Sequence, residues 1–338
     1  MSTIHDIASA MVKQGQGLLA ADESTGTIKK RFDSIHVDCT AASRCEYREM
    51  LFRSDAMKEA VSGVILFEET LNQTGSDGTR LVDLITATGA IPGVKVDKGA
   101  KPLAGHPGET VTEGLDGLRE RLAEYHDKGA RFAKWRSVIS IGDGRPSWNA
   151  VKANAHGLAR YAALCQEAGI VPIVEPEVAM DGPDAKHDID QCAEVSRWVL
   201  SAVFNELYDA KVDLEGMILK PNMVVPGQHC AKRASIEEVA EKTIACFKAE
   251  VPAAVPGIAF LSGGQTDLEA TAHLNAMNAA YDLPWVLTFS YGRALQASAL
   301  KTWCGKSENT AAAQKAFDHR ARMNGLAACG KWSDSLEV

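Results

Sequence analysis

The most reactive feature of the sequence is a single lysine at the end of an apolar run. The run Leu214-Glu-Gly-Met-Ile-Leu-Lys-Pro-Asn222 is typical of a buried strand, and Lys220 lies near its carboxyl end. An ammonium in a dry site loses its hydration, so its pKa falls and the neutral amine becomes a nucleophile that forms Schiff bases with carbonyl compounds. The alternative is that the aliphatic stem packs while the ammonium extends into water, which is the commoner behaviour of a lone lysine at a strand end.

The surrounding chain alternates short apolar runs with amphipathic helical segments. A helix is expected over about residues 3–14, and eight later runs predict strands. The predicted strands cover residues 17–22, 63–69, 93–98, 132–139, 170–178, 216–221, 258–262 and 285–290. Apolar strands that are each followed by a helix predict a parallel sheet covered on both faces, and eight such units predict a (β/α)8 TIM barrel.

The length favours one large domain of this kind. A barrel typically takes roughly 250 residues plus insertions, so the 338 residues fit one (β/α)8 barrel over residues 1–338 with a short N-terminal helix and a short C-terminal tail. Two domains are the other way to accommodate this length. A doubly wound open sheet is the alternative fold, but the G-x-G-x-x-G motif that would follow its first strand is missing.

Composition narrows the class of protein. With 36 basic and 44 acidic residues the net charge is -8, which offers no broad basic surface for nucleic acid or membrane. The eight cysteines are scattered without C-x-x-C spacing, which predicts reduced thiols in a cytoplasmic protein. The chain begins without a signal-peptide pattern and carries no apolar run of membrane-spanning length, although a transit peptide removed earlier would leave no trace.

The predicted strands repeatedly end in polar residues, and in a barrel these ends converge on one pocket. Packing does not explain apolar strands that so often finish in an ionisable group. These strand-end residues are Asp22, Glu23, Glu68, Glu69, Lys95, Asp97, Lys98, Lys134, Arg136, Glu175, Glu177, Lys220, Ser262 and Ser290.

Within this set, two lysines and two carboxyls suit imine chemistry. Like-charge repulsion between Lys134 and Lys220 would leave one of them neutral at pH 7. Glu175 is our candidate for the acid and base that imine formation needs, with Glu177 on the same strand face in support and Asp22 as a third carboxylate. The alternatives are a strand-end salt bridge for Lys134 and a purely charge-neutralising role for the two glutamates.

Two glycine turns indicate a phosphate site. Ser262 and Gly263 follow the seventh predicted strand, and Ser290, Gly292 and Arg293 follow the eighth. In a TIM barrel the loops after strands seven and eight commonly bind phosphate through backbone N–H groups at helix starts, although each loop alone is also typical of a tight turn.

A second anion site is expected from Lys98, Arg136 and the segment from Asp22 to Arg31. Two anion sites beside an amine nucleophile suggest a bisphosphorylated carbonyl substrate. The nine histidines show no H-x-H, H-x-x-H or H-E-x-x-H spacing, so we expect no catalytic metal.

These motifs closely resemble class I fructose-1,6-bisphosphate aldolases, the Schiff-base type. Eight stretches match in order, from about residue 5 to about residue 331. They are residues 18–26, 63–70, 94–99, 132–136, 172–177, 219–224, 260–265 and 288–296. The resemblance implies a metal-independent, cofactor-free and reversible cleavage of fructose 1,6-bisphosphate to dihydroxyacetone phosphate and glyceraldehyde 3-phosphate, a reaction of glycolysis and gluconeogenesis.

The resemblance also implies residue roles. Lys220 would form the imine, Lys134 would be the neighbouring ammonium, and Glu175 would shuttle protons during carbinolamine dehydration. Glu177 would help to organise the lysine, and Asp22 would handle the hydroxyl proton during carbon–carbon cleavage. The residues matching the C1-phosphate site are Ser262, Gly263, Gly292 and Arg293; those around the other phosphate are Ser24, Thr27, Arg31, Lys98 and Arg136.

The sequence departs from the family at two places. Many members end in a tyrosine that assists proton exchange on the enamine, whereas this chain ends in Ser335-Leu-Glu-Val338. We therefore expect another group to protonate the enamine, or protonation to be slower. Thr27 stands where many members have serine. The family is commonly tetrameric, so a cytoplasmic homotetramer that binds phosphorylated sugars is expected.

Two rival functions remain at this stage. Another Schiff-base barrel enzyme, such as a transaldolase or a keto-acid aldolase, would keep the strand-end lysine but would need no pocket for two phosphates. A catalytically silent scaffold on the same fold would have lost at least one of Asp22, Lys134, Glu175 or Lys220, and all four are present.

Overall fold

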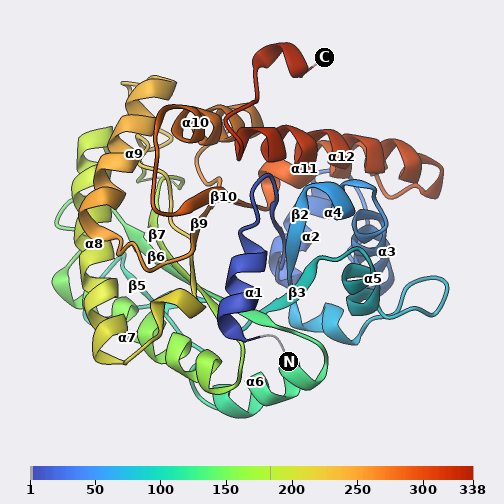
Figure 1. Cartoon of the computed structure of the whole chain (residues 1–338), viewed down its shortest axis with the longest axis horizontal. Helices are drawn as coiled ribbons and strands as arrows, with labels where there is room; N and C mark the ends of the chain where they lie inside the picture. Colours follow the sequence, from blue (N-terminus) through green and yellow to red (C-terminus); the bar gives the residue numbers. More distant parts are fainter. Residues whose placement is uncertain (1–2, 183, 338) are drawn as a thin grey trace.

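The computed structural model describes residues 3–182 and 184–337, and its centre is a closed barrel of eight parallel strands (Figure 1). The strands neighbour one another in the order β1-β10-β9-β8-β7-β6-β3-β2. Their bounds are β1 (Gly17–Ala21), β2 (Val61–Leu66), β3 (Ile91–Lys95), β6 (Phe132–Ser140), β7 (Val171–Ala179), β8 (Ile218–Leu219), β9 (Gly257–Phe260) and β10 (Val286–Tyr291). The TIM barrel predicted from the sequence is confirmed.

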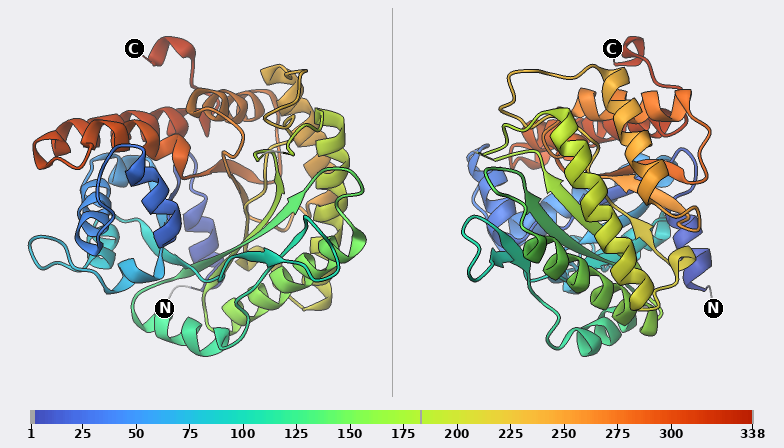
Figure 2. Two further views of the ribbon diagram at one scale, coloured as in Figure 1. Left: turned by 180° about the vertical axis from the view of Figure 1, so that it is seen from behind. Right: turned by 90° about the vertical axis from the view of Figure 1, so that its left-hand side faces the viewer.

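Helices surround the strands on the outside of the barrel (Figure 2). Sequence signals for their starts are visible in several cases, such as Asp188 with Gln191 and Thr266 with Glu269, which form capping boxes. The helices are α1 (Ile4–Met11), α2 (Thr25–Asp33), α3 (Ala41–Phe52), α4 (Ala56–Glu59), α5 (Leu81–Ala87), α6 (Leu118–Asp127), α7 (Trp148–Glu167), α8 (Ile189–Asp209), α9 (Ile236–Glu250), α10 (Asp267–Ala280), α11 (Arg293–Trp303) and α12 (Thr310–Ala327). None of the helices in residues 3–182 and 184–337 has the length and apolar character needed to cross a bilayer.

Some elements differ from the sequence prediction. A short antiparallel hairpin, β4 (Ala100–Pro102) and β5 (Thr110–Thr112), follows β3 and was not predicted. The strand predicted over 216–221 is shortened because residues 214–216 form a 3-10 turn and Pro221 has no N–H for the ladder. The predicted strand 63–69 ends earlier, since Glu68 and Glu69 belong to the 3-10 turn η1 (Glu68–Asn72).

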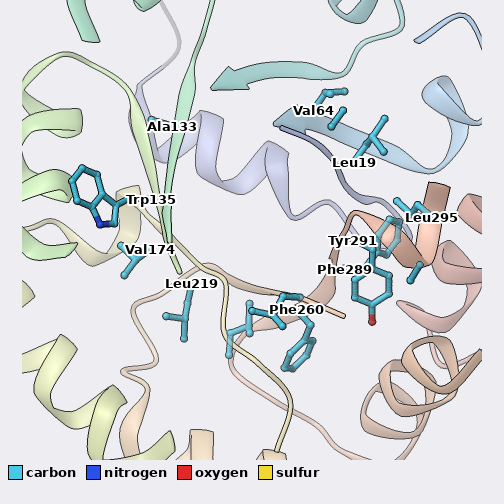
Figure 3. Close-up of a cluster of buried hydrophobic side chains, with 14 of the residues drawn as sticks. Leu19, Val64, Ala133, Trp135, Val174, Leu219, Phe260, Phe289, Tyr291 and Leu295 are labelled. Carbon is cyan, nitrogen blue, oxygen red and sulfur yellow. The ribbon is translucent and has the colours of Figure 1, made fainter. Parts of the chain in front are cut away.

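Strand alternation divides the side chains between two cores. Successive residues of a strand point to opposite faces, so Ala133 and Trp135 of β6 face the helices while Phe132 and Lys134 face the barrel interior. Figure 3 shows Trp135 and other side chains of the larger cluster, which lies between strands and helices. The interior positions therefore remain available for a second, smaller core and for polar groups.

The smaller core closes the amino end of the barrel. Helix α1 buries Ile7, Ala8 and Met11 in a cluster with interior residues that include Phe132 and Ile173. Figure 1 shows α1 lying across the centre of the strand ring. The barrel thus has an apolar floor at its amino end, and the polar interior residues lie toward its carboxyl end.

Replacing Gly93 by alanine should disturb this floor. An added Cβ would lie 2.3 Å from ring carbons of Phe132, so the ring must move within a packed interior. We expect a loss of about 1–3 kcal/mol in the free energy of unfolding, measured by urea titration and circular dichroism. Gly157→Ala is the matched control, because that Cβ meets nothing within 4 Å and alanine favours the helix. Equal effects of the two substitutions would contradict the packed floor.

Candidate active site

A cavity of about 550 Å³ opens at the carboxyl ends of the barrel strands. Strand ends and the loops that follow them supply most of its wall, and helix α2 supplies the rest. The lining residues are Ala20, Asp22, Glu23, Ser24, Thr27, Lys30, Arg31, Ser34, Lys95, Lys134, Arg136, Glu175, Glu177, Asp181, Lys220, Leu261, Ser262, Gly263, Ser290, Gly292 and Arg293. Fourteen of the fifteen site residues predicted from the sequence are in this set.

The two-residue period of the strands explains why charged groups share this space. On β7, Ile173 belongs to the apolar floor, and Glu175 and Glu177 follow it on the same face. The parallel register sets Lys95 of β3 beside Lys134 of β6, and Arg136 beside Glu175. On β6 and β7, therefore, an apolar interior residue lies below and an ionisable one above.

Three ion pairs connect the groups at the base of the cavity. The Nζ of Lys134 lies 2.6 Å from Oδ2 of Asp22 and 3.2 Å from Oε2 of Glu175. The Nζ of Lys220 lies 3.3 Å from the other carboxylate oxygen, Oε1, of Glu175. Both lysine side chains are almost fully buried, at 4–5% exposed. Glu175 thus bridges the two amines, while Asp22 forms an ion pair with Lys134 and with no other residue that the structure describes.

This arrangement separates the pKa values of the two lysines. Burial opposes protonation of both, because it removes the hydration of the ammonium. For Lys134, the carboxylates of Asp22 and Glu175 outweigh burial, and the pKa is raised above that of an ordinary lysine. For Lys220, burial and the like charge of Lys134 outweigh the single close carboxylate, and the pKa is lowered. Lys220 is therefore the amine most readily available as a nucleophile.

The two carboxyls respond in the opposite sense. Burial favours their neutral forms, but the charge of Lys134, followed by that of Lys220, outweighs it and lowers the pKa of both Asp22 and Glu175. The lowered pKa values favour the ionised form of both groups in the unliganded cavity, the form that can accept a proton. Repulsion between the two lysines was expected to leave one of them neutral, and of the two only Lys220 has a lowered pKa.

Glu177 forms its ion pair with an arginine rather than with a lysine. Its carboxylate pairs with the guanidinium of Arg136, and the negative charge raises the pKa of that arginine. Among the described residues, no ion pair joins Glu177 to Lys134 or Lys220. Glu177 therefore contacts Arg136 directly, and it acts on the lysines only through longer-range electrostatic interaction.

The two predicted phosphate loops lie together at one side of the cavity. The Oγ of Ser290 is buried and makes no hydrogen bond within the described part of the chain. Gly263 has no room for a side chain, since a Cβ would lie 2.8 Å from Sδ of Met180. Arg293 is the first residue of α11, and its guanidinium pairs with Asp181 at 3.0 Å. Backbone amides, hydroxyls and a guanidinium here suit an oxyanion.

The other predicted anion-binding residues lie on α2 and its approach. Ser24 is the residue before α2, and its hydroxyl lies 3.1 Å from that of Thr27. Arg31 pairs with Glu23. These groups and Arg136 form a second polar wall with donors for an anion.

The structure does not bring Lys98 to the cavity. Strand β3 ends at Lys95, so Lys98 falls in the segment beyond the strand, where its ammonium pairs with Glu68 at 3.2 Å. Lys95 lines the cavity instead. Side chains alternate between the two faces of a strand, so Gly93 and Lys95 share the interior face. The sequence prediction extended the strand to residue 98 and therefore assigned the anion site to Lys98 instead of Lys95. Lys30, which belongs to the segment from Asp22 to Arg31 expected at the second anion site, also lines the cavity. Ser34 and Asp181 line it as well, and no spacing signal pointed to them.

Known proteins match this chain over nearly its whole length. A family model described as fructose-bisphosphate aldolase class-I matches residues 3–338. The chain is 56% identical over 328 residues to a probable fructose-bisphosphate aldolase class 1 of Xanthomonas axonopodis pv. citri, covering 97% of both chains. It is 54% identical over 325 residues to the cytosolic fructose-bisphosphate aldolase 6 of Arabidopsis thaliana, covering 96% of this chain and 90% of the relative.

A solved structure is similar over the same length. It is the fructose-bisphosphate aldolase of Plasmodium falciparum in complex with TRAP and a small-molecule inhibitor. The TM-score is 0.95 and the sequence identity is 48%, with 98% of this chain and 95% of that chain covered.

The lowered pKa of Lys220 predicts its reactivity toward acylating reagents. Only the deprotonated amine reacts, so Lys220 should label at a lower pH than a lysine in a short peptide, measured by acetic anhydride labelling and peptide mass mapping. Lys134→Met removes the like charge and leaves Glu175 and Asp22 facing Lys220, so it should move the labelling curve up by about 1–3 pH units. Lys98→Met is the control and should leave the curve in place. Labelling of Lys220 at or above the pH of the peptide lysine would contradict the site electrostatics.

Proposed function

The chain belongs to the class I fructose-bisphosphate aldolase family, and we propose that Lys220 is the amine that attacks the ketone carbon of its substrate. Membership makes the protein a carbon–carbon lyase that acts on fructose 1,6-bisphosphate. The observation that supports Lys220 is the separation of the two lysine pKa values, because it leaves one buried amine free to react beside one that stays charged.

Glu175 is the proposed proton carrier for imine formation. Addition of the Lys220 amine to the C2 carbonyl gives a carbinolamine, whose hydroxyl must take up a proton before it leaves as water. The carboxylate of Glu175 touches Lys220 and is ionised at rest, so it can accept the proton of the newly formed ammonium and pass it to the C2 alkoxide. A second proton, drawn from solvent through the same carboxyl, then lets the hydroxyl leave as water and gives the protonated imine.

Asp22 and Lys134 are proposed to act in the bond-breaking step. The protonated imine accepts the electron pair of the C3–C4 bond, while Asp22 takes the proton of the C4 hydroxyl and glyceraldehyde 3-phosphate leaves. The enamine is then protonated at carbon, and water hydrolyses the imine to release dihydroxyacetone phosphate. The Lys134 ammonium, 2.6 Å from Asp22, holds that carboxylate in its basic form.

The two polar walls are the proposed phosphate sites. Ser262, Gly263, Gly292 and Arg293, with Ser290, would bind the C1 phosphate. Ser24, Thr27, Arg31 and Arg136 would surround the other phosphate, with Lys95 in the place first given to Lys98. We also propose that the protein is a cytoplasmic homotetramer; the name of the cytosolic Arabidopsis relative supports the compartment.

The described residues nearest the C-terminus lie away from the cavity. The carboxylate of Glu337 accepts a hydrogen bond from Nε1 of Trp332 at 2.8 Å and one from the guanidinium of Arg320. This holds the last described residues on α12, and none of residues 328–337 lines the cavity. We propose that Glu175, whose carboxylate lies 3.3 Å from Nζ of Lys220, carries out the proton exchange at the enamine carbon.

Borohydride trapping tests the imine directly. Incubation with dihydroxyacetone phosphate and borohydride in EDTA should leave a reduced adduct on Lys220 in peptide mass maps. Lys220→Met should abolish the adduct, and Lys98→Met should retain it. Absence of any adduct, together with loss of cleavage in EDTA, would instead indicate a metal-dependent enzyme and overturn the proposal.

Asp22→Asn separates the two chemical stages. It should still yield the Lys220 adduct with dihydroxyacetone phosphate, because imine formation does not use Asp22. Cleavage of fructose 1,6-bisphosphate should fall about 10²–10⁴-fold, since the general base for the C4 hydroxyl is lost. Equal loss of adduct and cleavage would assign Asp22 to imine formation.

A further inference from the structure

Each arginine that lines the cavity is already paired with a carboxylate. Arg31 pairs with Glu23. Arg136 pairs with Glu177, and Arg293 pairs with Asp181. A phosphate that binds any of these guanidiniums must therefore replace or share a carboxylate partner, and the three pairs differ in how readily they can release it.

The Arg293–Asp181 pair is the most open of the three. The side chain of Asp181 is 36% exposed, whereas those of Glu23 and Glu177 are both 4% exposed. Glu23 is held further by a hydrogen bond from Nε2 of Gln296 at 3.1 Å. An exposed ion pair contributes little to stability and rearranges readily, whereas a buried carboxylate that loses its partner is strongly penalised.

The backbone beside Asp181 is firmly placed. The preceding residue, Met180, packs on the loop after β9, where a Cβ on Gly264 would lie 2.3 Å from Cγ of Met180. The carbonyl of Met180 also accepts a hydrogen bond from the N–H of Gln228 at 2.9 Å. Asp181 therefore reaches Arg293 from a fixed position, and release of the guanidinium requires movement of side chains only.

We propose that Asp181 competes with the substrate phosphate for Arg293, holding the guanidinium in the empty enzyme and yielding it when a sugar phosphate binds. This inference rests on the proposed function, because it takes Arg293 as a phosphate ligand. A phosphate dianion brings more charge than a carboxylate and matches the guanidinium in bidentate fashion, so it displaces Asp181. An uncharged ligand end cannot displace it. Asp181 thereby favours phosphorylated over unphosphorylated ligands and recaptures Arg293 as product leaves.

The test measures binding of glycerol 3-phosphate by calorimetry, with glycerol as the uncharged probe. This phosphate monoester has no carbonyl group, so its binding does not depend on imine formation. Asp181→Asn should tighten binding roughly two- to fivefold, the range of an exposed ion pair, and should leave glycerol unaffected. In the Arg293→Gln background, Asp181→Asn should have no effect.

The neighbouring Asp184 provides the matched control. It lies in the same loop, and its carboxylate pairs with Arg145 at 3.1 Å rather than with Arg293. Asp184→Asn removes the same charge and should leave glycerol 3-phosphate affinity unchanged. Equal tightening by both variants would mean that the effect comes from net charge alone, and would overturn the inference. Unchanged or weaker binding in Asp181→Asn would overturn it as well.

Glycerol 3-phosphate binding to Arg293→Gln alone distinguishes failure of the Asp181 competition from failure of the proposed phosphate site. Weaker phosphate binding in Arg293→Gln without tightening in Asp181→Asn defeats only the competition. Unchanged binding in Arg293→Gln removes Arg293 from the proposed phosphate site and defeats the inference with it, while a Lys220 adduct would still support the imine.

Discussion

The contact between Lys134 and its two carboxylates determines the chemistry of the cavity. Asp22 directly follows β1, Glu175 lies on β7 and Lys134 on β6, so the closed barrel must bring three strands together to form it. In a poorly solvated site, an ammonium between two carboxylates remains charged despite burial. That charge keeps both carboxyls ionised and disfavours protonation of the neighbouring Lys220 amine. One ion-pair cluster thus sets the protonation of four groups.

The barrel makes such a cluster possible by confining the polar interior side chains to its carboxyl end. Interior side chains alternate along each strand, and the amino end is filled by an apolar layer under α1. The ionisable residues stand directly above that layer, where close packing limits their movement. Rigid placement also explains why two lysines whose pKa values are shifted in opposite directions can lie within reach of the same carboxylate, Glu175.

Much of this arrangement could be predicted from the sequence, because strand periodicity is local information. Apolar runs located all eight barrel strands, and their polar ends identified Lys220, Lys134, Glu175 and Asp22 as neighbours. Strand length was harder to predict, and an overlong β3 led to Lys98 in place of Lys95. The pairing of Glu177 with Arg136, and of Asp181 with Arg293, depends on side-chain placement across different strands and loops, which no spacing encodes. The direction of each lysine pKa likewise depends on distances that only the folded barrel defines.

Neutron diffraction from deuterated crystals of the unliganded enzyme would test the central claim most directly, because it counts the deuterons on each nitrogen. At a pH where the enzyme is active, we expect three deuterons on Nζ of Lys134, two on Nζ of Lys220, and none on the carboxyls of Asp22 and Glu175. Three deuterons on Lys220 with two on Lys134, or a deuteron on Glu175, would show that the cluster does not set the protonation states in this way.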